Sequence, residues 1–224
     1  MKKLLLIMIL AAITIPAHSD SIYVLGSYFI PKGNSDVYRQ NRIETTFEVQ
    51  DLNTVGGTFG YDHFLGDFIS IGGSASFYRS DTTVSDVDFE FENGQPIFRD
   101  IRLEIVPLEL NLRLLPAGRN AVIIPYVGGG IGAYMWEYEE FGDFVIDRFT
   151  DPSIITGSAF SDGTDFGYHV EGGVQIPVSR SATITGEVKY FSVEGDLDIE
   201  GFDPSFEPID LSAVTYSAGI SFWF

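Results

Sequence analysis

The chain has 224 residues, of which 45% are hydrophobic, and its 32 acidic residues against 13 basic ones give a formal net charge of −19. This acid excess argues against binding to nucleic acid, because affinity for the phosphate backbone requires clustered Lys and Arg. Cys is absent from the sequence, which excludes a disulfide framework, a cysteine zinc site and a thiol nucleophile.

The N-terminus has the parts of a secretory signal. Lys2 and Lys3 precede an apolar run over 4–15 that contains one polar residue, Thr14, and small residues follow it. The run is too short for a transmembrane helix, which needs about 20 apolar residues. The sequence therefore predicts export, with a signal peptide at 1–19 and a single domain at 20–224. Loss of the two lysines would leave the exported chain with a formal charge of −21.

Eight later segments alternate apolar and polar residues with a period of two, which is typical of β-strands with two different faces. In chain order they are 21–30, 54–64, 69–78, 106–114, 126–135, 166–176, 183–190 and 214–224. The last is the clearest, because Tyr216, Ile220 and Phe222 share one face while Ser217 and Ser221 lie on the other.

The connections between these segments alternate in length. Short links lie at 65–67, 115–120 and 178–182, and long ones at about 31–50, 80–100, 139–163 and 194–212. Short turns on one side, long loops on the other and an even strand count are marks of a membrane barrel. The sequence therefore predicts an all-β fold, an eight-stranded antiparallel up-and-down transmembrane β-barrel. A secreted lipocalin-like or sandwich protein would show the same alternation with its apolar face inward.

Ionisable residues occupy the faces that would line the barrel. They are Asp62, Glu109, Arg113, His169, Glu171, Glu187 and Lys189. Burying such charges in a sandwich would cost several kcal/mol per ion, whereas a barrel lumen accepts them. Since eight strands leave an interior that side chains fill, we predict a salt-bridged lumen. A narrow polar path for a small solute is the alternative.

Three segments carry a resemblance to a known family. They are the terminal strand 216–224, the glycine-rich block Pro-Tyr-Val-Gly-Gly-Gly-Ile-Gly-Ala-Tyr at 125–134, and the strand 106–113. The chain resembles the small outer-membrane β-barrels of Gram-negative-type bacteria, the OmpA-, OmpX- and OmpW-like barrels, without a further periplasmic domain. The resemblance implies a bacterial outer-membrane location, outer-membrane lipid as a partner, and a C-terminal strand read by the barrel-assembly machinery. It gives Tyr216, Phe222 and Phe224 the role of assembly signal.

The long loops hold much of the negative charge. The stretch 194–210 contains seven acidic residues and no basic one, and a further acidic cluster lies at 137–147. Carboxylates suit hard divalent cations such as Ca²⁺. The spacing around Asp196, Asp198 and Glu200 does not match an EF-hand, so solvated loops are the simpler interpretation and divalent cations an open one.

Some outer-membrane barrels are lipid A acyl-modifying hydrolases or proteases, and such chemistry requires a nucleophile beside a base and an orienting carboxylate. After the signal the sequence offers only His63 and His169 as imidazole bases. We therefore predict no enzymatic activity and no cofactor. The expected function is a structural or interaction role at the cell surface. A narrow channel and an outer-membrane lipid-modifying enzyme are the two alternatives.

Overall fold

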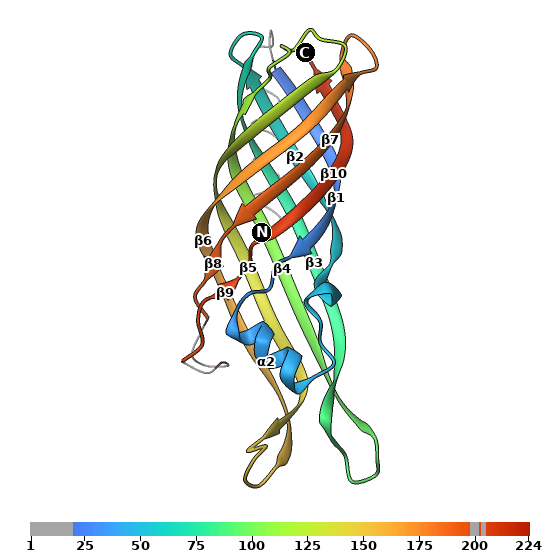
Figure 1. Ribbon diagram of the computed structural model, residues 1–224, viewed down its shortest axis with the longest axis vertical. Helices are drawn as coiled ribbons and strands as arrows, with labels where there is room; N and C mark the ends of the chain where they lie inside the picture. Colours follow the sequence, from blue (N-terminus) through green and yellow to red (C-terminus); the bar gives the residue numbers. More distant parts are fainter. Residues whose placement is uncertain (1–19, 198–201, 203–204) are drawn as a thin grey trace.

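The computed structural model describes residues 20–197, 202 and 205–224. The expected signal peptide at 1–19 lies outside the described residues, as do Asp198, Glu200 and Asp203 of the acidic loop. Eight strands form one closed antiparallel barrel in the order β1-β10-β7-β6-β5-β4-β3-β2 (Figure 1). Their bounds are β1 Asp20–Pro31, β2 Thr54–Phe64, β3 Ile69–Glu90, β4 Pro96–Leu114, β5 Ile124–Ile146, β6 Ser153–Pro177, β7 Ala182–Ser192 and β10 Ala213–Trp223.

The predicted eight-stranded up-and-down barrel is confirmed, because each barrel strand pairs with the barrel strands before and after it in the chain and β1 closes the ring against β10. Turns at 65–68, 115–123 and 178–181 lie at one end, where Asp20 and Phe224 also pair; we call this the short-turn end. It is uppermost in Figure 1, and the long loops lie at the opposite, long-loop end.

The connection between β1 and β2, which the sequence predicts as a long loop, contains helix α2 (Asp36–Glu44) and the 3-10 turn η1 (Val49–Leu52). Asp36 in the first turn and Arg42 in the last complement the helix dipole. The buried face of α2 carries Tyr38, whose ring meets that of Tyr138 on β5 edge to face at a centroid distance of 5.9 Å. The helix therefore packs against the long-loop end of the barrel.

Four strands are much longer than a bilayer crossing requires. The strands β3, β4, β5 and β6 have 22, 19, 23 and 25 residues, whereas the other four barrel strands have 11 or 12. About 9–11 tilted residues cross a membrane. The extra length forms two hairpins, β3–β4 and β5–β6, which project from the long-loop end (Figure 1). The remaining long loop contains the short pair β8 (Glu194–Gly195) and β9 (Ile209–Asp210).

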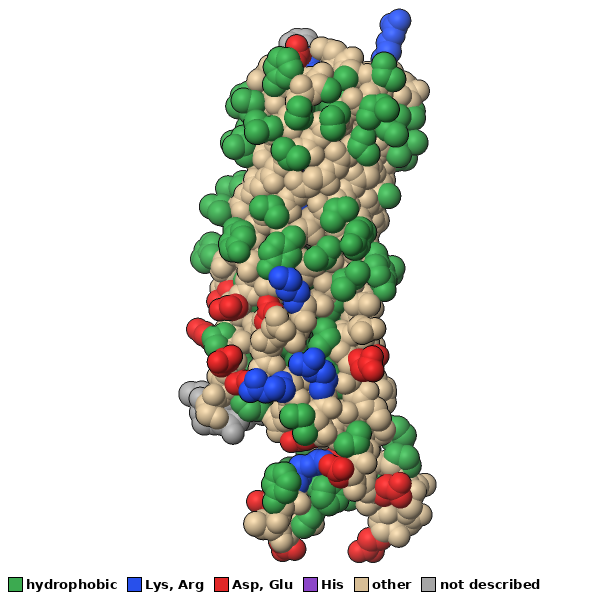
Figure 2. Space-filling model, in the orientation of Figure 1, with side chains coloured by type: hydrophobic (Ala, Val, Ile, Leu, Met, Phe, Trp, Pro, Cys, Tyr) green, Lys and Arg blue, Asp and Glu red, His purple; other side chains and the backbone are tan. Residues whose placement is uncertain are grey.

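The apolar face of β4 changes sides along the strand. Near the short-turn end Leu110 and Leu112 point outward and are exposed, while Glu109 and Arg113 point inward. Beyond Val106 the pattern reverses: Ile101, Leu103 and Ile105 are buried inside, and Arg102 and Glu104 lie outside. Figure 2 shows the same division on one face, with apolar side chains toward the short-turn end and charged ones mostly toward the long loops. The outer apolar zone is the part suited to lipid.

Glycine is required inside the barrel at Gly130. A Cβ at this position would overlap the carbonyl oxygen of Leu110 on the paired strand and lie 2.8 Å from His169 Cε1. We expect Gly130→Ala to lower the free energy of unfolding by about 1–3 kcal/mol, because an overpacked wall must shift β4 from β5.

Urea unfolding of the barrel in lipid vesicles, followed by tryptophan fluorescence, measures this effect. Gly186→Ala is the matched control, since nothing lies within 4 Å of a Cβ there. Equal stability of the two alanine variants would contradict the prediction.

Candidate functional site

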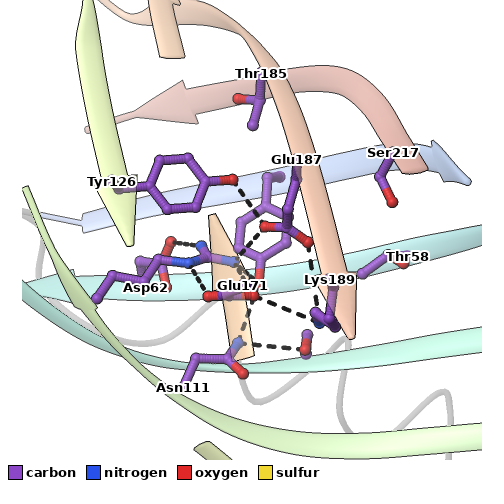
Figure 3. A network of polar contacts seen from close by, with 12 residues as sticks. Thr58, Asp62, Asn111, Tyr126, Glu171, Thr185, Glu187, Lys189 and Ser217 are labelled. Atoms are coloured by element: carbon purple, nitrogen blue, oxygen red, sulfur yellow. Dashed lines mark hydrogen bonds and ion pairs between the residues drawn. The ribbon is translucent and has the colours of Figure 1, made fainter. Parts of the chain in front are cut away.

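Arg113 on β4 is the centre of an ion network inside the barrel. Its Nη1 lies 2.5 Å from Asp62 Oδ2, its Nε 2.5 Å from Glu171 Oε1, and its Nη2 3.0 Å from Glu187 Oε2. These carboxylates come from β2, β6 and β7, so one guanidinium joins four strands across the lumen (Figure 3). The guanidinium also lies over the Tyr23 ring, 4.9 Å from its centroid.

Lys189 on β7 extends the same network toward the long-loop end. Its Nζ lies 2.5 Å from Glu109 Oε2 and 3.6 Å from Glu171 Oε2, which Arg113 also contacts. Tyr134 donates its hydroxyl hydrogen to Glu109 Oε1 at 2.9 Å. Glu109, Arg113, Glu171, Glu187 and Lys189 thus form one connected layer, which we call the ion layer together with Asp62 and His169.

The ion layer has fewer positive charges than negative ones. Four carboxylates, those of Asp62, Glu109, Glu171 and Glu187, face two permanent cations, Arg113 and Lys189. The acceptor atom Asp62 Oδ1 has no hydrogen-bond partner among the described residues. His169 is fully buried, with Nδ1 3.5 Å from Glu109 Oε1 but in no hydrogen bond among the described residues. Since each cation contacts several carboxylates, removing a cation must lower the free energy of unfolding more than neutralising one acid does.

Apolar side chains close the lumen on both sides of the ion layer. Toward the short-turn end Phe64, Leu115, Ile124 and Tyr126 pack together, with Trp223 against them. Toward the long-loop end a larger cluster fills the interior. It includes Phe29, Tyr38, Leu103, Tyr134, Trp136, Tyr138 and Phe191. The clustering of these apolar side chains and the role of Tyr23 were not predicted from the sequence, because strand register decides which inward side chains meet.

The remaining candidate residues lie apart from the ion layer. Tyr216, Phe222 and Phe224 are exposed on the outer, lipid-suited surface. His63 is at the short-turn end, where its Nδ1 lies 2.6 Å from Asp20 Oδ1. The described residues contain no group of three or more His, Cys, Asp or Glu that could hold a metal ion, so divalent cations at the acidic loops stay a prediction.

The two projecting hairpins are tied together by an ion pair. Arg148, between β5 and β6, places Nη1 2.6 Å from Asp86 Oδ2 on β3 and Nη2 3.2 Å from Asp88 Oδ2. Burial raises the pKa of Asp86, but the Arg148 guanidinium and the backbone amides of Asp88 and Phe89 outweigh it, and the pKa falls below its ordinary value.

This tie should respond to acid. Because the pKa of Asp86 is lowered in the folded state, its ion pair contributes fully to stability above the ordinary Asp pKa of about 3.9. This contribution is lost as the pH falls through the lower pKa of the folded state. We expect spin labels at Asn93→Cys and Ser153→Cys to report a narrow distance distribution near neutral pH and a broad one in acid. In Arg148→Gln the distance distribution should be broad at neutral and at acidic pH. A narrow distribution in this variant at neutral pH would refute the tie.

A closed antiparallel barrel with an apolar outer zone and a polar, ion-paired interior is the architecture of a transmembrane β-barrel, since closure leaves no strand edge unpaired in lipid. The chain matches the family model described as outer membrane protein beta-barrel domain over residues 4–222, and it belongs to this family. Its location is the bacterial outer membrane, and in such barrels the short turns face the periplasm and the long loops the exterior.

Solved structures share the fold at low sequence identity. OprG from Pseudomonas aeruginosa is 13% identical, with 92% of this chain and 95% of that chain covered and a TM-score of 0.56. Neisserial surface protein A is 11% identical, with 94% and 100% covered and a TM-score of 0.51. A major outer membrane protein from Thermus thermophilus is 10% identical, with 92% and 99% covered and a TM-score of 0.50. No curated protein is similar enough in sequence to count as a relative.

Among the described residues, no helix has the length and apolarity to cross a membrane.

Proposed function

We propose that the chain is a non-conducting outer-membrane barrel that holds a connected set of loops at the cell surface, where it acts by contact with other molecules. The observation that carries this proposal is the filled lumen. The ion layer joins β2, β4, β6 and β7 across the interior, and apolar clusters lie above and below it. An ion crossing the barrel would have to displace both apolar clusters and the network between them, at a high desolvation cost.

Reconstitution into planar bilayers tests this function against the narrow channel. We expect current no higher than that of the bare bilayer in simple salt across a moderate voltage range. Steady single-channel steps from the folded barrel would establish transport instead. Correct folding of the same sample is checked by its heat-dependent shift in gel mobility.

The contact role is supported by the β5–β6 hairpin, whose tip carries exposed apolar side chains beyond the membrane zone. Phe149 is 99% exposed, and Ile146, Ile154 and Ile155 beside it are also exposed. Exposed apolar groups gathered in one place favour an interaction site. We expect Phe149→Ser to reduce the aggregation of cells that display the barrel, measured by their sedimentation, and their attachment to surfaces. Thr150→Ser should leave both unchanged.

The structure also supports a role without catalysis. His169 is buried in the filled lumen, so no substrate reaches it, and His63 contacts Asp20 at the periplasmic end. Assays of the folded barrel on lipid A and on a peptide substrate test this, with His169→Ala as the control. Turnover that this change abolishes would establish an enzyme.

Recognition by the barrel-assembly machinery is part of the same proposal. The outer surface exposes Tyr216 and Phe222 of β10, and Phe224 after it. In the proposal, the assembly machinery contacts these side chains before the strand enters lipid. We expect Phe224→Ser to lower the amount assembled in cells while leaving refolding in vesicles nearly unchanged. Equal losses in both assays would assign Phe224 to lipid contact alone.

A further inference from the structure

The periplasmic end of the barrel contains two hollows with no assigned role. The larger has a volume of about 360 Å³ and lies between the turns 115–123 and 178–181; the smaller, of about 300 Å³, reaches toward Phe224. Arg119, Asn120, Arg180 and Trp223 line both. Two arginines from different turns therefore line a shared space, and Arg180 among them is exposed.

The arginines at this end have little to neutralise them. Arg180 makes no hydrogen bond or ion pair with any described residue. The Arg119 Nε lies 3.4 Å from Oδ1 of the half-exposed Asp67, and its guanidinium lies over the Phe64 ring, 5.7 Å from the centroid. No acidic residue lines the larger hollow; in the smaller one the carboxylate of Asp20 is already paired with His63.

The wall of the larger hollow also has unused hydrogen-bonding capacity. The Trp223 Nε1–H, which can only donate, and the Thr183 hydroxyl are buried without a partner among the described residues. Val122 and Pro177 add apolar surface beside them. The hollow thus combines positive charge, adjacent donors and an apolar wall, in a chain that is otherwise strongly acidic.

We propose that this end of the barrel binds a phosphate-bearing group, held by Arg119 and Arg180. A phosphate group, as an ester or a diester, presents at least two anionic oxygens that can engage two guanidinium forks, whereas one fork already satisfies a carboxylate. Because Val122 and Pro177 line the hollow, the proposed ligand also carries an organic part that contacts this apolar wall. Two sources offer this chemistry: the headgroup of an anionic lipid in the inner leaflet, and a soluble phosphate ester. This site is separate from the proposed surface role.

Tryptophan fluorescence tests the site, because the chain has only two tryptophans. In Trp136→Phe the signal comes from Trp223 alone. In one arm the barrel in phosphatidylcholine nanodiscs is titrated with glycerol phosphate; in the other, phosphatidylglycerol is added to the nanodisc. A saturable change in the first arm identifies a soluble ester, and a change in the second alone identifies a lipid headgroup.

Arg180→Gln should weaken the response about tenfold or more, since a charge-assisted hydrogen bond is lost. Arg42→Gln is the matched control, an exposed arginine at the opposite end of the barrel. No response in either arm, or an equal response from Arg180→Gln, would overturn the proposal. If Trp136→Phe does not fold, phosphorus NMR replaces the fluorescence titration with glycerol phosphate. The unsubstituted chain should broaden the phosphorus line of glycerol phosphate, and Arg180→Gln should broaden it less.

Discussion

Arg113→Met is expected to lower the free energy of unfolding by about 3–5 kcal/mol, since removing one partner of a buried ion pair leaves uncompensated charge. Here one change leaves Asp62, Glu171 and Glu187 without the guanidinium that contacts all three. We expect the variant to refold poorly into vesicles and to unfold at much lower urea than the parent chain.

Two variants of the same layer serve as controls. Arg113→Lys keeps the charge but not the three-way geometry, so its stability should fall between those of the parent and Arg113→Met. Glu187→Gln removes one of four acids that face two cations, and it keeps groups able to bond Arg113 and Tyr126. Of the three variants, Glu187→Gln should lower the free energy of unfolding least. A stability of Arg113→Met equal to that of Glu187→Gln would show that the layer is not held by charge.

Phe191→Ala is expected to lower the free energy of unfolding by about 3–5 kcal/mol, the range for removing a large side chain from a packed core. Phe191 is 0% exposed, and its ring lies 5.1 Å from that of Tyr134 and 6.2 Å from that of Phe29. The effect should appear in urea unfolding as a lower midpoint with little change in slope.

Phe149→Ala is the matched change at the exposed hairpin tip, where we expect less than about 0.5 kcal/mol. The pair separates a packed interior from a water-filled one. If the outer half of the lumen were hydrated, Phe191 would contribute little, and the two alanine variants would unfold at similar urea concentrations.

The barrel was predictable because its strands pair a lipid-facing apolar row with a polar inner row. Residues 214–224 show this in the sequence, and Glu109 and Arg113 mark the inward face of their strand. Alternation along the strands also assigns each of the charged residues to the inside. Their partners were not predictable, since strand register decides which side chains meet.

The outer half of the barrel was harder to predict. Leu103 and Ile105 point inward although Leu110 points outward, and both sets look like one apolar segment in sequence. The reversal occurs where β4 leaves the membrane zone, a position that sequence periodicity does not mark. Helix α2 was missed because its nine residues have a weak apolar face, in which Val37, Tyr38 and Asn41 are the buried positions.

Thiol labelling shows whether the lumen is closed to water, because the cysteine-free chain is a clean background. Ser217→Cys places a thiol inside the barrel on the residue paired with Glu187, and Ser158→Cys places one on the exposed β5–β6 hairpin. With a membrane-impermeant maleimide, we predict rapid labelling at 158 and none at 217 until the barrel is unfolded. Labelling at 217 in the folded barrel at a rate close to that at 158 would contradict a closed lumen.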